Sequence, residues 1–175
     1  MFGNRGRDAG GYRRRRVGRP EGNGGLKTAG DGDEEPVGRD GYVLDEQVGF
    51  LLRQAQQRHA VLFAECFGGD LTPTQWAVLA KLAEIGECSQ NLLGRYTAMD
   101  VATIKGVVQR LDARHLVLRR HDPDDRRQLL ISLSAEGRSV YTARLADARR
   151  ASEATLAPLG ERERAILLRC LRTLR

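Results

Sequence analysis

The chain has 175 residues, of which 41% are hydrophobic and 30% are charged. This composition is typical of one folded domain with a tail, and it excludes a wholly disordered chain. A membrane protein is also excluded, because no apolar run reaches the roughly 18 residues that a bilayer span needs. The net charge is +6 and 26 of the 29 basic residues are arginines, whose planar fork suits phosphates and guanine edges. We therefore expect an anionic polymer as a partner.

Residues 1–41 are predicted to form a disordered tail rich in arginine and glycine. They hold 12 of the 20 glycines and too few apolar side chains to offset the entropy of ordering. The basic block at Arg13–Arg16 is a candidate for an auxiliary DNA contact, although charge runs are more often simply solvated. The first 20 residues contain seven arginines and no apolar stretch. This pattern predicts no secretory signal and a cytoplasmic, nucleoid-associated protein.

A first helix is predicted from residue 44 to the Gly68-Gly69 pair, because apolar side chains recur there at helical spacing. This stripe consists of Leu44, Val48, Leu51, Leu52, Ala55, His59, Leu62 and Cys66.

Three further helices are predicted between residue 70 and about residue 114. Asp70-Leu71-Thr72-Pro73 supplies a cap and a first-turn proline for a second helix that Gly86 ends. Ser89 is a good cap for a short third helix, and Asp100 caps a fourth that reaches about Arg114. Two helices joined by so short a turn predict a helix-turn-helix.

Two strands, 117–120 and 129–133, flank a polar tip over residues 122–127, which predicts a β-hairpin wing. Ser134 opens a long helix that is broken near Pro158, and a last helix follows. We therefore expect a mainly α fold with a small β-wing. The predicted units are an N-terminal dimerisation helix, a winged helix-turn-helix DNA-binding domain and C-terminal dimerisation helices, over residues 42–68, 70–133 and 134–175.

Six short motifs occur in order along these elements. They are Leu71-Thr72-x-x-Gln75-Trp76-x-x-Leu79, Met99-Asp100-x-Ala102-Thr103-Ile104, Arg110-Leu111-Asp112, Leu116-Val117-x-Arg119, Asp122-x-x-Asp125-x-Arg127 and Leu133-Ser134-x-x-Gly137. With these gaps, residues 44–175 resemble the MarR family of winged-helix transcription regulators. The stretch 97–111 is somewhat similar to repressors of nicotinate breakdown. His115 departs from the family, which usually has glycine at this position, where a positive φ is needed.

The fourth helix has a polar face that is expected to meet DNA in a major groove. Thr103, Lys105 and Gln109 are placed near base edges, and Arg110 contacts either a phosphate or its own domain. The remaining candidate DNA contacts are Ser89 and Gln90 at the start of the third helix and Arg126 and Arg127 in the wing. By resemblance, Arg127 enters the minor groove. Residues 89–127 hold eight basic and five acidic residues, a balance that favours DNA over protein as the partner.

The terminal helices carry apolar stripes that nothing obvious in the chain covers, so a homodimer on a pseudo-palindromic operator is expected. The resemblance implies a repressor that a small aromatic carboxylate releases, for example 6-hydroxynicotinate. The predicted effector site combines Arg53 for the carboxylate, Gln56 and His59 for ring substituents, and Trp76 for stacking. Core packing is the competing interpretation for Trp76 and His59.

Two alternatives remain open: a redox-sensing regulator that uses Cys66 or Cys88, and a winged-helix scaffold that binds protein. An enzyme is not expected, because the histidines are scattered and no nucleophile or phosphate-loop motif accompanies them. No cofactor is predicted. The three aspartates at the wing tip, Asp122, Asp124 and Asp125, are more typical of turn chemistry than of a metal site, and Asp125 is expected to orient an arginine.

Overall fold

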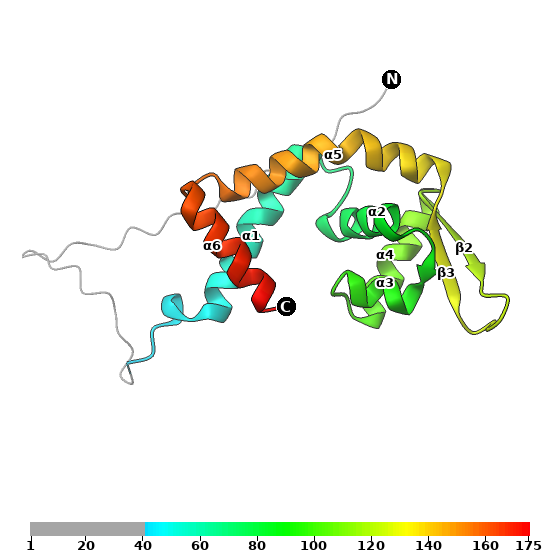
Figure 1. The fold of residues 1–175 in the computed structure, drawn as a ribbon, viewed down its shortest axis with the longest axis horizontal. Coiled ribbons are helices and arrows are strands. Elements are labelled where there is room, and N and C mark those ends of the chain that lie inside the picture. Colours follow the sequence, from blue (N-terminus) through cyan, green and yellow to red (C-terminus); the bar gives the residue numbers. More distant parts are fainter. Residues whose placement is uncertain (1–40) are drawn as a thin grey trace, which may run out of the picture. The chain divides into compact units, whose positions relative to one another are not determined.

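The computed structural model describes residues 41–175, so the tail predicted over residues 1–41 lies outside the described residues apart from Gly41. The chain runs through helices and strands in an order that confirms the predicted winged helix-turn-helix architecture (Figure 1). The elements are η1 (Leu44–Glu46), α1 (Val48–Phe67), α2 (Pro73–Ile85), β1 (Cys88–Ser89), α3 (Gln90–Tyr96), α4 (Val101–Ala113), β2 (Val117–His121), β3 (Leu129–Leu133), α5 (Ala135–Leu156) and α6 (Glu161–Thr173).

The first helix begins later than its apolar stripe suggests. Leu44 lies in the short 3-10 turn η1, and α1 starts only at Val48. Between them Gln47 has an extended backbone, with φ −80° and ψ 128°, and its side-chain amide donates a hydrogen bond to the Val43 carbonyl. The extended residue interrupts what the periodicity alone predicts as one helix.

The three strands form an antiparallel sheet in the order β1-β3-β2. Strands β2 and β3 form the predicted wing, with Val117 opposite Leu133 and His121 opposite Leu129. Strand β1 was not predicted, because two residues are too few to show a period. It pairs Ser89 with Leu130, so the start of α3 is attached directly to the wing.

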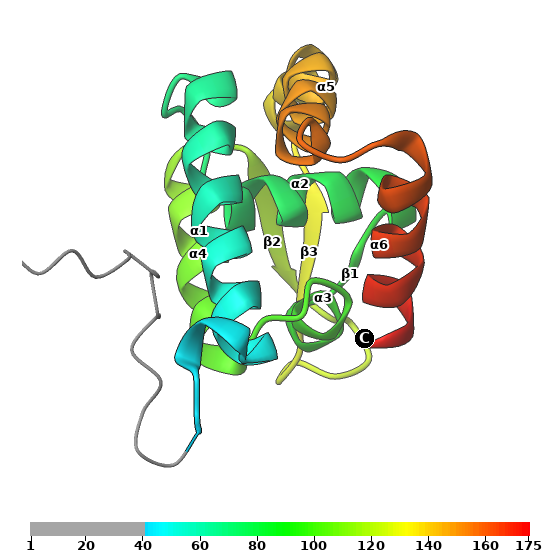
Figure 2. The ribbon, with the colours of Figure 1, turned by 90° about the vertical axis from the view of Figure 1, so that its left-hand side faces the viewer.

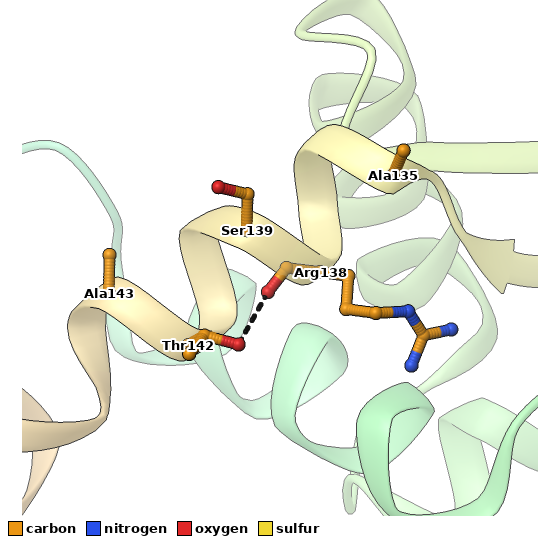
Figure 3. A pocket seen from close by; sticks show the side chains of 5 residues that line it. All are labelled: Ala135, Arg138, Ser139, Thr142 and Ala143. Carbon is orange, nitrogen blue, oxygen red and sulfur yellow. Dashed lines mark hydrogen bonds between the residues drawn. The ribbon is translucent and has the colours of Figure 1, made fainter.

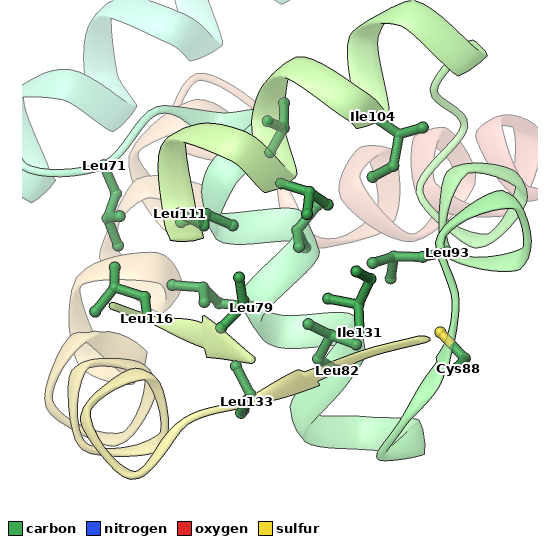
Figure 4. Close-up of a cluster of buried hydrophobic side chains, with 14 of the residues drawn as sticks. Leu71, Leu79, Leu82, Cys88, Leu93, Ile104, Leu111, Leu116, Ile131 and Leu133 are labelled. Carbon is green, nitrogen blue, oxygen red and sulfur yellow. The ribbon is translucent and has the colours of Figure 1, made fainter. Parts of the chain in front are cut away.

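One hydrophobic core holds α2, α3, α4 and the sheet together. Leu79 and Leu82 of α2, Leu93 of α3, Leu111 of α4 and Ile131 of β3 are all almost fully buried, and their side chains converge in Figure 4. Phe63 and Phe67 extend this core into the end of α1. The half predicted to bind DNA, residues 70–133 (hereafter the DNA-binding half), therefore has its core closed within a single chain, with the end of α1 as part of it.

Close backbone packing fixes the start of α5. The Ser134 hydroxyl donates to the His115 carbonyl (2.7 Å) and accepts from the Gly137 amide (2.9 Å), while the Ser134 amide donates to the Leu116 carbonyl. A Cβ on Gly137 would lie 1.9 Å from the Leu116 oxygen, so only glycine fits. His115 has φ 58°, the left-handed conformation expected of this position.

The helices α1 and α6 expose much of their apolar surface. α1 crosses and packs against α5, and α6 turns back from the C-terminal end of α5 (Figures 1 and 2). No residue of α6 is buried. The exposed apolar side chains of these two helices are Val48, Leu51, Leu52, Val61, Ile166, Leu167, Leu168 and Leu171. Over residues 41–175, no helix combines the length and the apolar character that a membrane span requires.

Candidate nucleic-acid interface and effector cavity

Helix α4 has one buried and one exposed face. Ile104, Val107, Val108 and Leu111 are buried in the core. The four candidate DNA contacts of this helix, Thr103, Lys105, Gln109 and Arg110, are all exposed. The helix therefore presents polar side chains to solvent on the face that the sequence assigns to DNA.

The first turn of α4 is fixed by its cap. The Asp100 carboxylate accepts a hydrogen bond from the Thr103 amide and another from the Thr103 hydroxyl, both at 2.8 Å. These bonds, first of all the one from the amide, hold the pKa of the Asp100 carboxyl below its usual range. Because the hydroxyl proton of Thr103 is committed to Asp100, its oxygen is available as an acceptor, which suits an amino group on a base edge.

The structure brings the start of α3 next to the tip side of the wing, where β3 begins. Ser89 caps α3, with its hydroxyl accepting from the Leu92 amide at 3.3 Å. Together with Gln90, it lines a small cavity of about 90 Å³ to which Arg127 and Gln128 of the wing also contribute. Three of the predicted DNA contacts thus lie beside one another, a proximity that follows from the β1–β3 pairing.

The aspartates of the wing act through turn geometry. Asp125 accepts hydrogen bonds from the Arg127 amide (3.0 Å) and from the Gln128 side chain (3.3 Å), and Asp122 accepts one from the Asp124 amide. Asp125 therefore positions Arg127 through its backbone and leaves the guanidinium exposed. In the part of the chain that the structure describes, no cluster of three or more His, Cys, Asp or Glu side chains could hold a metal.

The basic residues of the DNA-binding half fall into two groups. Arg119 pairs with Asp112 at 2.9 Å, Arg120 binds Glu87 through two nitrogens, and Arg114 donates to the Asp70 carbonyl at 2.5 Å. The second group makes no ion pair with any carboxylate among residues 41–175, and consists of Arg95, Lys105, Arg110, Arg126 and Arg127. The eight basic residues counted in the sequence thus reduce to five that are free for an anionic partner.

A cavity of about 380 Å³ lies between α1, α5 and α6. Its lining is Leu52, Ala55, Gln56, His59, Ser152, Thr155, Leu156, Leu167, Leu168 and Leu171. Two of the four predicted effector residues, Gln56 and His59, are therefore brought together. Arg53 is exposed on α1 and does not line this cavity.

Thr155 sets the orientation of the His59 ring. The Thr155 hydroxyl donates its one proton to the Ala151 carbonyl at 2.7 Å, and His59 Nδ1 lies 2.8 Å from the same oxygen. Nδ1 must therefore carry a proton and donate. Within residues 41–175 this arrangement leaves Nε2 available to a ligand.

Trp76 packs in an aromatic cluster outside this cavity. Its ring stacks on Tyr141 of α5, with centroids 5.4 Å apart, and meets Phe67 of α1 edge-on at 5.3 Å. The indole is partly buried against the core. The structure thus places Trp76 where α1, α2 and α5 meet, which is consistent with the packing role that the sequence left open.

A larger hollow of about 600 Å³ follows the outer surface of α5. Figure 3 shows that its lining side chains, Ala135, Arg138, Ser139, Thr142 and Ala143, all come from this one helix. The Thr142 hydroxyl donates to the Arg138 carbonyl within the same helix (2.9 Å). Such a surface lacks facing walls and converging polar groups, so it has no features of a ligand site.

The cysteines differ in exposure. Cys88 is buried, and burial followed by the nearby Glu87 charge raises the pKa of its thiol. A raised pKa reduces the thiolate that peroxide attacks, which argues against Cys88 as a redox sensor. Cys66 is half-buried, and Cys170 on α6 is exposed.

Comparison with known proteins identifies similar chains. The model of the MarR family matches residues 71–129. The HTH-type transcriptional repressor NicR of Pseudomonas putida is 40% identical over 138 residues, which are 78% of this chain and 87% of NicR.

Two solved structures are similar in fold and sequence. A probable transcriptional regulator from Pseudomonas aeruginosa is 56% identical, with a TM-score of 0.72 over 76% of this chain and 100% of that one. BpsR of Bordetella bronchiseptica, whose DNA binding is regulated by 6-hydroxynicotinic acid, is 38% identical, with a TM-score of 0.72 over 76% of this chain and 96% of BpsR. These relatives are regulators of transcription and not enzymes, as the sequence predicted.

Proposed function

This chain belongs to the MarR family of DNA-binding transcription regulators, and on that premise we propose that it is a homodimeric repressor released from its operator by a small aromatic acid. The observation that carries the DNA-binding part is the set of unpaired cations on α4 and the wing. Lys105 and Arg110 project from the exposed face of α4, and Arg126 and Arg127 from the wing tip. In this proposal α4 enters a major groove while the wing arginines reach the neighbouring minor groove.

The exposed apolar faces of α1 and α6 support the homodimer. Several apolar side chains exposed on neighbouring helices are typical of an interface between subunits. Leu51 and Leu52 of α1 and Leu167, Leu168 and Leu171 of α6 are the candidate contacts. A two-fold axis through these helices would present two copies of α4 to two half-sites, which is the geometry of a pseudo-palindromic operator.

The cavity beside His59 supports the effector part. Its volume of about 380 Å³ is in the range of small-molecule sites, and five of its ten lining residues are leucines. His59 Nε2 can accept a hydrogen bond from a hydroxyl group of the ligand, and Gln56 can bind a ring nitrogen or a second oxygen. 6-Hydroxynicotinate, the compound that regulates BpsR, or a related hydroxy-aromatic carboxylate fits this chemistry.

DNA binding is tested with duplexes that the purified protein selects from a random-sequence library. We expect nanomolar binding in fluorescence anisotropy, and a fall in affinity with salt whose logarithmic slope is about −0.9 for each phosphate neutralised. Arg126→Ala and Arg127→Ala should each weaken binding and flatten this slope. Arg149→Ala, on the exposed part of α5, is the matched control and should change neither. Failure to select any specific duplex would contradict the regulator proposal.

The effector is tested on the same complex by adding 6-hydroxynicotinate, salicylate or a hydroxycinnamate. We expect one of these acids to dissociate the DNA. The variant His59→Ala should then bind DNA normally but respond much more weakly to the acid. Gln57→Ala, a neighbour on α1 that does not line the cavity, should respond like the unchanged protein. DNA binding that is insensitive to every acid would refute the effector part and leave the DNA-binding part intact.

A further inference from the structure

The cavity beside His59 has no permanently charged group in its lining. Its side chains come from α1, α5 and α6, and apart from His59 none of these described residues is ionisable. Arg53, the cation that the sequence assigns to a ligand carboxylate, does not line it. The ion pair of Glu153 with Arg164, which joins α5 to α6 at 3.2 Å, also lies outside the lining. Within residues 41–175, His59 is therefore the one group that could hold an anion in this cavity by its charge.

The two hydroxyl groups of the lining present acceptors to a ligand. The Ser152 hydroxyl donates to the Ala148 carbonyl at 3.1 Å. The Thr155 hydroxyl donates to the Ala151 carbonyl at 2.7 Å. Because a hydroxyl has only one proton, neither oxygen has a donor left for a ligand. In the described part of the chain, the amide of Gln56 is then the one lining side chain with a donor to offer besides His59.

The neutral ring of His59 is also an acceptor on the side that is open to a ligand. Its Nδ1 proton is committed to the Thr155 oxygen at 2.8 Å, so Nε2 of the neutral ring has a lone pair and no proton. A hydroxyl or an amide N–H of a ligand can donate to this lone pair. A carboxylate placed there would bring two acceptors together and leave both unsatisfied. A single proton between the two atoms converts this contact into a charge-assisted hydrogen bond.

We infer that an acid binds in this cavity together with one proton, which lies between its carboxylate and His59 Nε2. At pH 8 the free imidazole is neutral and the free acid is ionised, because imidazoles ordinarily titrate at about pH 6.5 and carboxyl groups at about pH 4. The complex therefore takes up one proton from the solvent. The ligands that fit are aromatic weak acids and their neutral amides, which bring an N–H of their own. The inference rests on the proposed function, because it specifies the form in which the effector binds.

Proton uptake determines how the effector responds to pH. Between pH 7.5 and pH 8.5, the Kd of an acid that binds with one proton rises about tenfold, by linkage. The Kd of the matching amide stays constant over this range, because the amide needs no proton. By the same linkage, the acid dissociates the operator complex at a lower concentration as the pH falls.

The test is titration calorimetry of the full chain with 6-hydroxynicotinate at pH 8, in phosphate and in Tris, two buffers with different heats of ionisation. The difference between the measured heats gives the number of protons taken up, and we expect about one for each acid bound. 6-Hydroxynicotinamide should bind without proton uptake. If salicylate is the acid that releases the operator, salicylate and salicylamide are the matching pair.

The variant His59→Gln tests the role of the ring. Glutamine can accept a hydrogen bond but cannot carry the proton, so the acid should bind at least about tenfold more weakly at pH 7.5. The amide should lose less than about threefold in affinity, because its own N–H can donate to the glutamine oxygen. Gln57→Ala, which does not line the cavity, is the matched control and should keep both affinities and the proton uptake. An equal loss for acid and amide in His59→Gln would contradict a role of the ring in holding the proton.

Two further results would overturn the inference. The first is binding of the acid without proton uptake. If Arg53→Ala also abolished that binding, a guanidinium and not His59 would hold the carboxylate. The second is the same pH dependence of Kd for the acid and the amide. Both results leave the effector proposal intact, because the acid still binds. Absence of binding by every acid tested on the operator complex would instead remove the effector part of the proposed function, and this inference with it.

Discussion

The DNA-binding half and the terminal helices differ in how far their apolar side chains are buried within the chain. Between Leu71 and Leu133, side chains from three helices and three strands form one core, which Phe63 and Phe67 of α1 and Ala151 of α5 complete, and the ion pairs around it are made within the chain. α6 has no buried residue, and much of the apolar stripe of α1 is exposed. The core of the first region is closed within one chain, whereas the exposed apolar side chains of the terminal helices need a second surface, which we propose is another copy of this chain.

The junction between the two regions offers the largest expected effect. Gly137→Ala places a Cβ 1.9 Å from the Leu116 carbonyl oxygen, and backbone cannot move aside as a flexible side chain can. We expect a loss of about 3 kcal/mol or more in the free energy of unfolding, measured in urea. Gly49→Ala, which has open space around it, is the control. Unchanged stability of Gly137→Ala would show that α5 does not rest on the Leu116 backbone.

A charge on α6 should weaken the proposed dimer and leave the DNA-binding half unchanged. Leu171→Asp is expected to weaken the dimer about 30-fold, the effect of losing a contact worth about 2 kcal/mol at an interface. Sedimentation at micromolar concentration measures this change. Leu118→Asp makes the same substitution at an exposed leucine of the wing and should leave the dimer intact. If Leu171→Asp remained a dimer of normal strength, α6 would not belong to the interface.

Acid should weaken the cap of α4. The pKa of Asp100 is lowered in the folded state by its hydrogen bonds from Thr103, so its stabilising effect is fully present above the unfolded pKa of about 3.9. It is lost as the pH falls through the lower folded value. Asp100→Ala should therefore unfold at a lower temperature than the unchanged protein at pH 7, and this difference should shrink below about pH 4. A difference that stays constant from pH 7 to pH 2 would contradict the role of the charged cap.

The smallest expected effect is a difference in thiol reactivity between the same two regions. Cys88 is buried in the core with a raised pKa, whereas Cys170 is exposed on α6. At pH 8 we expect iodoacetamide to modify Cys88 at least about tenfold more slowly than Cys170, because the thiolate is the reactive form. Mass spectrometry of the digested protein measures both rates. Equal rates would make Cys88 accessible and would revive the redox alternative.

Local signals made most of the fold predictable. Thr72, Ser89, Asp100 and Ser134 each cap the helix for which the sequence chose them, because a cap involves residues only three positions apart. The positive φ of His115 was likewise anticipated from its place after α4. Local signals did not predict the break between η1 and α1 at Gln47, because the apolar pattern continues across this extended residue.

The candidate site was less predictable, because it depends on distant contacts. Arg120 was counted among the DNA-facing cations, yet its partner Glu87 lies 33 positions earlier in the chain. Gln56 and His59 share a cavity with α6, a helix that no local pattern connects with α1. Arg53 and Trp76 have residue types that suit an effector, but type alone does not say which way a side chain faces.

The stacking of Trp76 on Tyr141 provides an intrinsic optical reporter. The chain has one tryptophan, so all indole emission comes from the point where α2 rests on α5. A rearrangement that slides the DNA-binding half along α5 would change the environment of this indole and shift its emission maximum. Operator binding and its reversal can therefore be followed in real time on the unlabelled protein, at a position that does not line the cavity beside His59.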